Sequence, residues 1–288
     1  MDTRSDIILR AALGEDRAFE DHTSQKIAKR SQKVRAVIVA KERFVIAGLP
    51  FAKRVFKLRD RRVRVSLKVG EGDWVPKGRI VAKVFGDAIS ILSAERTALN
   101  ILQHLSGIAT ATRNTVVKTK RYGVQVLDTR KTLPGLRKLQ KYAVRVGGGI
   151  NHRHSLSDAI LIKNNHLAIA GGVNASLRKI PKRLRGRVQV EVRSLRDARA
   201  AITSGARKLL LDNQTPVKLK GWVRAIRKIR PNIWIEASGG ITPQNAEAYA
   251  RTGVNAISLG ALTHSPRAVD LSLRVSEPSR PPKRSQRA

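Results

Sequence analysis

The sequence of 288 residues contains no cysteine. Disulfide bonds, zinc sites built on thiolates and cysteine nucleophiles are therefore excluded. It also lacks any uninterrupted apolar run of about 18 residues, so it predicts no transmembrane helix. The opening stretch, MDTRSDIILRAALGED, has neither the long apolar run nor the small-residue cleavage site of a signal peptide. We therefore expect a soluble protein of the cytoplasm.

Acidic residues are scarce, because 21 Asp and Glu stand against 58 Lys and Arg, giving a formal net charge of +37. Such an excess points to polyanionic partners, either nucleic acid or phosphorylated small molecules. The basic residues run through the whole chain, although residues 280–287 form a basic, proline-containing tail. Aromatic residues make up only 4%, so a platform on which bases could stack is poorly supplied. We therefore do not expect nucleic acid to be the main partner.

Two regions with different patterns follow one another along the chain. Residues 1–120 mix strand-like stretches with a helical stretch at 94–119, in which Gly107 is a candidate break. Residues 121–262 alternate amphipathic helical segments with short apolar runs, at 124–127, 159–162, 188–192, 208–212, 233–238 and 256–260. Such alternation predicts a parallel sheet. We therefore expect a smaller N-terminal α+β domain followed by an α/β domain.

The ends of the last four apolar runs recur at a regular distance. Glu191, Asp212, Ser238 and Gly260 are 21, 26 and 22 residues apart. This period favours a TIM-like β/α barrel over a doubly wound sheet. Because catalytic residues of such barrels gather at the carboxyl ends of the strands, the candidate site lies at these run ends.

Basic side chains cluster around the first two runs. Arg130 and Lys131 follow the first run, His152 and Arg153 precede the second, and Lys163 follows it. Guanidinium groups hold carboxylates or phosphates with two hydrogen bonds, and Lys adds a point charge. The cluster would therefore suit a substrate with several negative charges. A solvated basic pair remains the alternative for Arg130 and Lys131.

Carboxylates and glycines end the remaining runs. Alternation along 188–192 puts Glu191 on the face opposite three valines, where it would face the barrel lumen. Glu191 and Asp212 could hold ribose hydroxyls, help to coordinate Mg²⁺ or stabilise positive charge on a sugar, although Asp212 could simply cap the next helix. Ser238-Gly239-Gly240 and Gly260 would let backbone N–H groups approach a phosphate closely.

Residues 128–167, DTRKTLPGLRKLQKYAVRVGGGINHRHSLSDAILIKNNHL, closely resemble the central signature of quinolinate phosphoribosyltransferases. The resemblance runs nearly end to end and includes EDHTS, VIAGLPFAKRVF, ERTALNILQHLSGIATATR, VEVRSLRDA, LLLDN, IEASGGI and ISLGALTHS. It implies an N-terminal α/β domain, to which segment 263–288 returns, and an incomplete β/α barrel. It also implies a homodimer in which one subunit covers the barrel mouth of the other.

The reaction that the resemblance implies joins quinolinate to the ribose of phosphoribosyl pyrophosphate, with Mg²⁺. The products are nicotinate mononucleotide, pyrophosphate and carbon dioxide, in a step of NAD synthesis. Loss of the carboxylate beside the ring nitrogen leaves a carbanion that the cationic nitrogen stabilises, so no side chain needs to be a nucleophile. Catalysis would rest mostly on positioning and electrostatics.

The resemblance also assigns roles to single residues. Those matching quinolinate-binding positions are Arg130, His152, Arg153 and Lys163, with Arg96 contributed by the neighbouring subunit. The phosphoribosyl pyrophosphate site would comprise Thr129, Lys131, Glu191, Asp212, Ser238, Gly239, Gly240, Leu259, Gly260 and Ala261. Lys163, Glu191 and Asp212 would act in catalysis, and the two acids are candidate Mg²⁺ ligands, mainly through the substrate pyrophosphate.

Two departures and two alternatives accompany this interpretation. Gln189 stands where the family often has an acid, which would weaken Mg²⁺ binding near the ribose, and Ser155 stands where glycine is frequent.

One alternative is a relative of the same fold that acts on another base, such as the one found beside molybdate transport genes. The other is a basic nucleic-acid-binding protein that kept the fold and lost activity. Quinolinate turnover that depends on phosphoribosyl pyrophosphate, rather than salt-sensitive DNA binding, would separate them.

Overall fold

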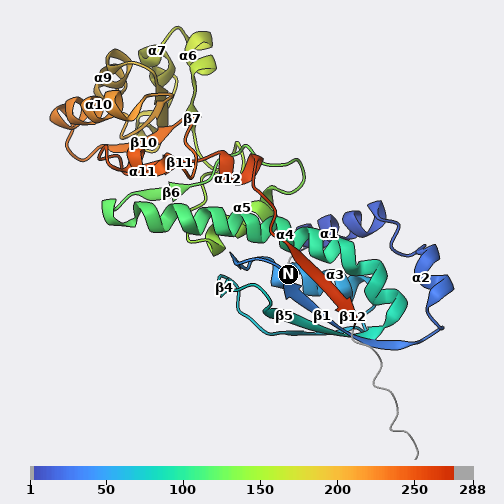
Figure 1. Ribbon diagram of the computed structural model, residues 1–288. Helices are drawn as coiled ribbons and strands as arrows, with labels where there is room; N and C mark the ends of the chain where they lie inside the picture. The colour runs from blue at the N-terminus through green and yellow to red at the C-terminus, as the bar shows by residue number, and fades with distance from the viewer. Residues whose placement is uncertain (1–2, 276–288) are drawn as a thin grey trace, which may run out of the picture. The chain divides into compact units, whose positions relative to one another are not determined.

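The computed structural model describes residues 3–275, apart from the side chain of Arg4 (Figure 1). The chain divides into two compact units, one formed by residues up to Gly107 together with those from Arg267 onward, the other by Ile108–Pro266. The sequence pattern suggested divisions after residues 120 and 262 instead. The basic stretch 280–287 lies outside the described residues. Among residues 3–275, no helix combines the length and the apolar character that crossing a bilayer requires.

The first unit is built on a four-stranded antiparallel sheet in the order β12-β1-β5-β3. In β1, Ile38 lies opposite Leu273 of β12, so the described end of the chain belongs to this sheet. The elements of the unit are α1 (Thr3–Glu15), α2 (His22–Ile27), β1 (Lys33–Ala40), β2 (Phe44–Val45), α3 (Leu49–Arg59), β3 (Arg64–Leu67), β4 (Trp74–Val75), β5 (Ile80–Asp87), the first part of α4 (Ala88–Thr119) and β12 (Leu271–Val275).

Helix α4 continues through Gly107, where the sequence suggested a break. A β-carbon at Gly107 would lie 2.0 Å from the carbonyl oxygen of Arg267. Only glycine lets the returning chain approach the helix so closely. The glycine is therefore explained by a tertiary contact, despite its cost of about 1 kcal/mol in helix propensity.

The second unit alternates strands and helices as the sequence predicted. After the 3₁₀ turn η1 (Lys120–Tyr122) its elements are β6 (Gln125–Leu127), α5 (Arg137–Val146), β7 (Leu161–Ile162), α6 (Asn164–Ala170), α7 (Val173–Arg178), α8 (Lys182–Arg185), β8 (Gln189–Val192), α9 (Leu195–Thr203), β9 (Lys208–Asp212), α10 (Pro216–Ile229), β10 (Trp234–Ser238), α11 (Ala246–Ala250), β11 (Ala256–Ser258) and α12 (Ala261–His264).

Six parallel strands form one sheet in the order β6-β11-β10-β9-β8-β7. The first strand of the unit thus pairs with the last, as in a closed barrel, while β6 and β7 remain unpaired with each other. A regular β/α barrel has eight strands, so the sheet is an incomplete barrel. The predicted fold class, an α/β protein with an incomplete β/α barrel and a smaller N-terminal α+β domain, is confirmed, and the sheet of the N-terminal domain is antiparallel.

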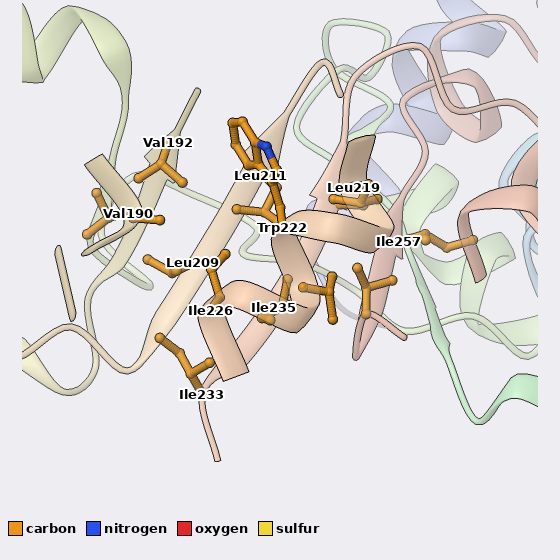
Figure 2. Close-up of a cluster of buried hydrophobic side chains, with 14 of the residues drawn as sticks. Val190, Val192, Leu209, Leu211, Leu219, Trp222, Ile226, Ile233, Ile235 and Ile257 are labelled. Atoms are coloured by element: carbon orange, nitrogen blue, oxygen red, sulfur yellow. The ribbon is translucent and has the colours of Figure 1, made fainter. Parts of the chain in front are cut away.

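The core of the second unit lies between the sheet and its helices. Leu209, Leu211 and Ile235 point from β9 and β10 toward Trp222 and Ile226 of α10 (Figure 2). Full burial of one such side chain contributes about 1.5–3 kcal/mol. Because strand side chains alternate between faces, this packing directs the intervening residues into the barrel lumen.

Candidate active site

A cavity of about 520 Å³ lies at the carboxyl ends of the parallel strands in the second unit. All but two of the predicted site residues line it, namely Thr129, Arg130, Lys131, His152, Arg153, Lys163, Glu191, Asp212, Ser238, Gly239, Gly240, Gly260 and Ala261. These residues are distant in sequence, and the parallel topology brings them together because it places every strand's carboxyl end at one rim.

Two predicted residues do not line this cavity. The side chain of Leu259 is fully buried, and its backbone N–H donates to the carbonyl of Leu127 at 3.0 Å. That N–H has no capacity left for a phosphate, so Leu259 is withdrawn from the candidate site. Arg96 belongs to α4 in the first unit, where its side chain is exposed.

Two guanidinium groups give the cavity a concentrated positive charge. Arg153 is held in place because its Nη1 donates to the carbonyl of Ala159 at 2.9 Å. Burial and the nearby charge of Arg130 lower the pKa of the Arg153 guanidinium, which nevertheless remains charged in a protein. The buried Nε of Arg130 has no hydrogen-bond partner among the described residues. An anion between the two groups would relieve their repulsion and supply the missing acceptor.

The two lysines at the cavity come from strand ends whose backbones are fixed. The backbone N–H of Lys163 donates to Nδ1 of His166 at 2.9 Å at the start of α6, which gives His166 a capping role. The carbonyl of Lys131 accepts from Thr263 Oγ1 at 2.7 Å. A β-carbon at Gly260 would lie 3.0 Å from the Lys131 side chain, so that side chain passes close over the glycine. Arg130 and Lys131 therefore both line the cavity, with Arg130 partly buried and Lys131 exposed.

The two predicted carboxylates line the same cavity. Glu191 is 8% exposed and its Oε1 accepts from the backbone N–H of Asn164 at 3.3 Å. Oδ2 of Asp212 accepts from Nε and Nη2 of Arg193 at 3.0 and 2.9 Å. Asp212 does not cap α10, because Thr215 is the capping residue and accepts from the N–H of Lys218.

Residues 3–275 contain no group of three or more His, Cys, Asp or Glu side chains arranged to hold a metal ion. Within that range, Oε2 of Glu191 and Oδ1 of Asp212 have no hydrogen-bond partner. Mg²⁺ is usually bound by one or two carboxylates together with substrate phosphates and water. The two acids therefore fit a metal that arrives with a phosphorylated substrate.

A glycine-rich turn follows β10 and forms part of the cavity wall. Gly239 has φ +92°, and a β-carbon there would lie 2.1 Å from Oδ1 of Asn213. The backbone N–H of Asn213 donates to the carbonyl of Ser238 at 2.9 Å. The turns after β9 and β10 are thus packed against each other, and no larger residue than glycine fits at position 239.

The cavity also has residues that the sequence interpretation did not single out, among them Asn213, Glu236 and His264. Glu236 could have been found by strand alternation, because Ile235 and Ala237 face the helices and Glu236 therefore faces the lumen. Its side chain is 2% exposed.

Gln189 also faces the lumen, but it does not line the cavity at the strand ends. Its Nε2 donates to Oε2 of Glu236 at 2.8 Å, and it lines a second cavity of about 260 Å³. Gln189 lies two residues before Glu191 on β8, further from the strand end at which the first cavity lies. Gln189 therefore acts directly on Glu236, through this hydrogen bond.

A buried ion pair fixes the chain that carries His152. Lys141 of α5 contacts Asp128 after β6, and both side chains are fully buried. Lys141 Nζ also donates to the carbonyl of His152 at 2.8 Å, and the N–H of His152 donates to Asp128 Oδ1 at 2.9 Å. Burial raises the pKa of Asp128 and lowers that of Lys141.

The chain matches two family models that together cover most of its length. Residues 21–106 match the N-terminal domain of quinolinate phosphoribosyl transferase, and residues 108–274 match the C-terminal domain. The boundary between the two matches falls at Gly107, where the compact units divide.

Several known proteins are similar over nearly their whole length. A probable carboxylating nicotinate-nucleotide pyrophosphorylase of Bacillus subtilis is 43% identical over 91% of this chain and 90% of its own. A decarboxylating quinolinate phosphoribosyltransferase of Nicotiana tabacum, named as mitochondrial, is 35% identical over 93% of this chain and 81% of its own. The solved nicotinate-nucleotide pyrophosphorylase of Francisella tularensis superposes with a TM-score of 0.85, at 38% identity, over 94% of this chain and 97% of its own.

Proposed function

Since the chain belongs to the quinolinate phosphoribosyltransferase family and makes nicotinate mononucleotide for NAD biosynthesis, we propose that its strand-end cavity binds quinolinate and phosphoribosyl pyrophosphate side by side. One observation carries this assignment. Two guanidinium groups, two lysines, three carboxylates and a glycine-rich turn line a single cavity of about 520 Å³. That volume lies within the range of about 300–1,000 Å³ typical of small-molecule sites.

Quinolinate binds at the cationic side of the cavity, where Arg130, His152, Arg153 and Lys163 lie. The unpartnered Nε of Arg130 and the repulsion felt by Arg153 support this, because two substrate carboxylates would satisfy both. Guanidinium groups hold carboxylates through paired, charge-assisted hydrogen bonds. Among these cations we assign the catalytic role to Lys163. Its ammonium group can stabilise negative charge that develops in the transition state.

Phosphoribosyl pyrophosphate binds at the glycine-rich side of the cavity. Its 5′-phosphate contacts Ser238-Gly239-Gly240 and the start of α12 at Gly260 and Ala261, where backbone N–H groups are available. Thr129 and Lys131 contact the pyrophosphate. Glu191 and Asp212 line the same cavity and contact the ribose.

Glu191 and Asp212 are also the residues that would hold Mg²⁺, together with the pyrophosphate. Bound there, the ion would neutralise charge on the leaving pyrophosphate. The two acids themselves hold the ribose hydroxyls and stabilise positive charge on the sugar carbon as the pyrophosphate departs. The ring nitrogen of quinolinate then forms the bond to that carbon.

The ribosylated ring nitrogen is positively charged, and this charge drives decarboxylation. The bond between C2 and its carboxylate breaks and carbon dioxide leaves. The electron pair left on C2 is stabilised by the adjacent cation and takes up a proton from water, which gives nicotinate mononucleotide. The protein contributes chiefly alignment and fixed charges. The cavity side chains supply both without a nucleophile.

A homodimer completes the site through Arg96 of a second copy of the chain. Support comes from the exposure of Arg96 on α4 and from its sequence match to a substrate-binding arginine. We also propose that the reaction takes place in the cytoplasm, as the sequence predicted.

A spectrophotometric assay of quinolinate consumption tests the assignment. Turnover should require phosphoribosyl pyrophosphate and Mg²⁺, and it should fall when Arg130 or Arg153 is replaced by Ala. Unchanged turnover in both variants would remove the cationic side of the cavity from the site.

A further inference from the structure

Glu236 is the most buried carboxylate of the cavity and has no role in the account above. It lies on β10 and is 2% exposed. It lines both the strand-end cavity and the second cavity of about 260 Å³. Its Oε2 accepts from Gln189 Nε2 at 2.8 Å, whereas its buried Oε1 has no hydrogen-bond partner among the described residues. Since a buried unsatisfied carboxylate oxygen is costly, its presence calls for a functional reason.

The neighbour of this carboxylate is the imidazole of His152, which also lines both cavities. Nε2 of His152 lies 3.6 Å from Oε2 of Glu236. Nδ1 of the same ring accepts from the backbone N–H of Arg153 at 2.8 Å. An acceptor at Nδ1 carries no proton, so the ring proton resides on Nε2. His152 therefore turns its N–H toward the cavity and Glu236.

The backbone beneath the ring is fixed from both sides. The N–H of His152 donates to Asp128 and its carbonyl accepts from Lys141, and these two partners form the fully buried ion pair. The backbone thus cannot shift easily, and the ring orientation depends on the groups at its edge. Glu236 is the acid placed there, and Gln189 orients that carboxylate.

We infer that Glu236 is a positioning residue that holds the ring of His152 with its Nε2–H directed into the cavity, where a substrate carboxylate can accept that hydrogen bond. The inference rests on the proposed function, because it takes quinolinate as the acceptor. His152 then differs in kind from the arginines and lysines around it. It supplies a directed hydrogen bond, and they supply charge.

The carboxylate form of Glu236 fits this role. Burial by itself would raise the pKa of Glu236, but the approach of His152 and the hydrogen bond from Gln189 outweigh it and lower the pKa below its ordinary value. An ionised Glu236 accepts hydrogen bonds only, so it favours the ring tautomer that presents an N–H toward it.

Nuclear magnetic resonance of histidine rings tests the inference in the full-length protein. The chain has only 6 histidines, so in a two-bond ¹⁵N–¹H spectrum the signal of His152 can be assigned by its loss in His152→Ala. We expect the wild type at pH 7.5 to show the Nε2–H tautomer. A ring protonated at Nδ1, alone or together with Nε2, would overturn the inference, even if no Glu236 variant folds.

Kinetics of Glu236 variants supply the second readout. Glu236→Leu should mix the tautomers of His152 and raise the KM for quinolinate about tenfold, the value of one hydrogen bond. The KM for phosphoribosyl pyrophosphate should stay within about twofold. Glu236→Gln keeps an acceptor oxygen and should restore most of the loss.

The two possible failures give different results. If His152→Ala leaves the KM for quinolinate unchanged, His152 does not contact quinolinate and the assignment of the substrate site is wrong. If His152→Ala raises that KM but Glu236→Leu changes neither the KM nor the ring spectrum, the positioning role of Glu236 is wrong.

Discussion

Lys141 donates to the carbonyl of His152 while its ammonium group contacts the fully buried Asp128. Burial lowers the pKa of Lys141 and raises that of Asp128, whereas the contact between the two side chains opposes both shifts and so stabilises both charges. Lys141→Met would leave the buried carboxylate without a countercharge. We expect it to lower the free energy of unfolding by about 3–5 kcal/mol, measured by urea denaturation.

Lys228 on α10 is exposed and provides the matched control. Lys228→Met should change the free energy of unfolding by no more than about 0.5 kcal/mol. Adding Asp128→Asn to Lys141→Met should recover part of the loss, since it removes the unpaired charge. Equal effects of the two lysine substitutions would contradict the importance of the buried pair.

Arg153→Ala and Lys163→Ala should each reduce kcat/KM by at least about a hundredfold while the fold survives. The reason is that both cations line the cavity and would hold or stabilise negative charge on quinolinate. Steady-state assays give the rates, and circular dichroism checks the fold. Arg183→Ala serves as the control, because Arg183 is exposed on α8 and does not line this cavity. Near-normal turnover in either variant would remove that residue from the site.

Gly239→Ala should weaken the binding of phosphoribosyl pyrophosphate and raise its KM about tenfold or more. The added methyl group would collide with Asn213 and strain a backbone at φ +92°, so the turn after β10 must move. Isothermal titration with phosphoribosyl pyrophosphate measures the loss directly.

Gly221 offers the opposite case within α10, because a β-carbon there meets no atom within 4 Å. Gly221→Ala should raise the free energy of unfolding by about 0.5–1 kcal/mol and leave the KM values unchanged. If both glycine substitutions behaved alike, the close packing at Gly239 would not matter for the substrate.

Glu247 contributes stability that depends on pH. Hydrogen bonds from Arg251, Tyr122 and Arg121 lower the pKa of its carboxyl from 4.5 to about 2. A carboxyl with a lowered pKa stabilises the fold above its unfolded pKa, and that stabilisation is lost as the pH falls through the folded value. The difference in Tm between the wild type and Glu247→Gln should therefore be full at pH 6 and shrink steadily below about pH 4.5. A difference that stayed constant down to pH 2.5 would be inconsistent with this titration.

Local patterns were sufficient to predict much of the second unit. The β9 strand has the predicted bounds, Lys208–Asp212. A short apolar run between two helical segments is typical of a buried strand. The cavity residues at the strand ends followed from the same alternation, since parallel strands place their carboxyl ends together.

Long-range contacts explain what the sequence did not reveal. Lys141 belongs to an amphipathic helix, where lysine ordinarily faces water, and only the distant strand end at Asp128 accounts for its burial. Gly107 suggested a helix break because glycine often ends a helix. The contact that explains this glycine, with the carbonyl oxygen of Arg267, could not be seen because Arg267 is remote in sequence. The family resemblance placed Leu259 at the phosphoribosyl pyrophosphate site, but its backbone N–H donates to Leu127.

A crystal structure of the enzyme with quinolinate bound tests the central claim most directly. We expect quinolinate in the strand-end cavity, with its two carboxylates within hydrogen-bond distance of Arg130, Arg153 and Lys163. Quinolinate bound elsewhere, or bound in the cavity without contact to these three side chains, would contradict it.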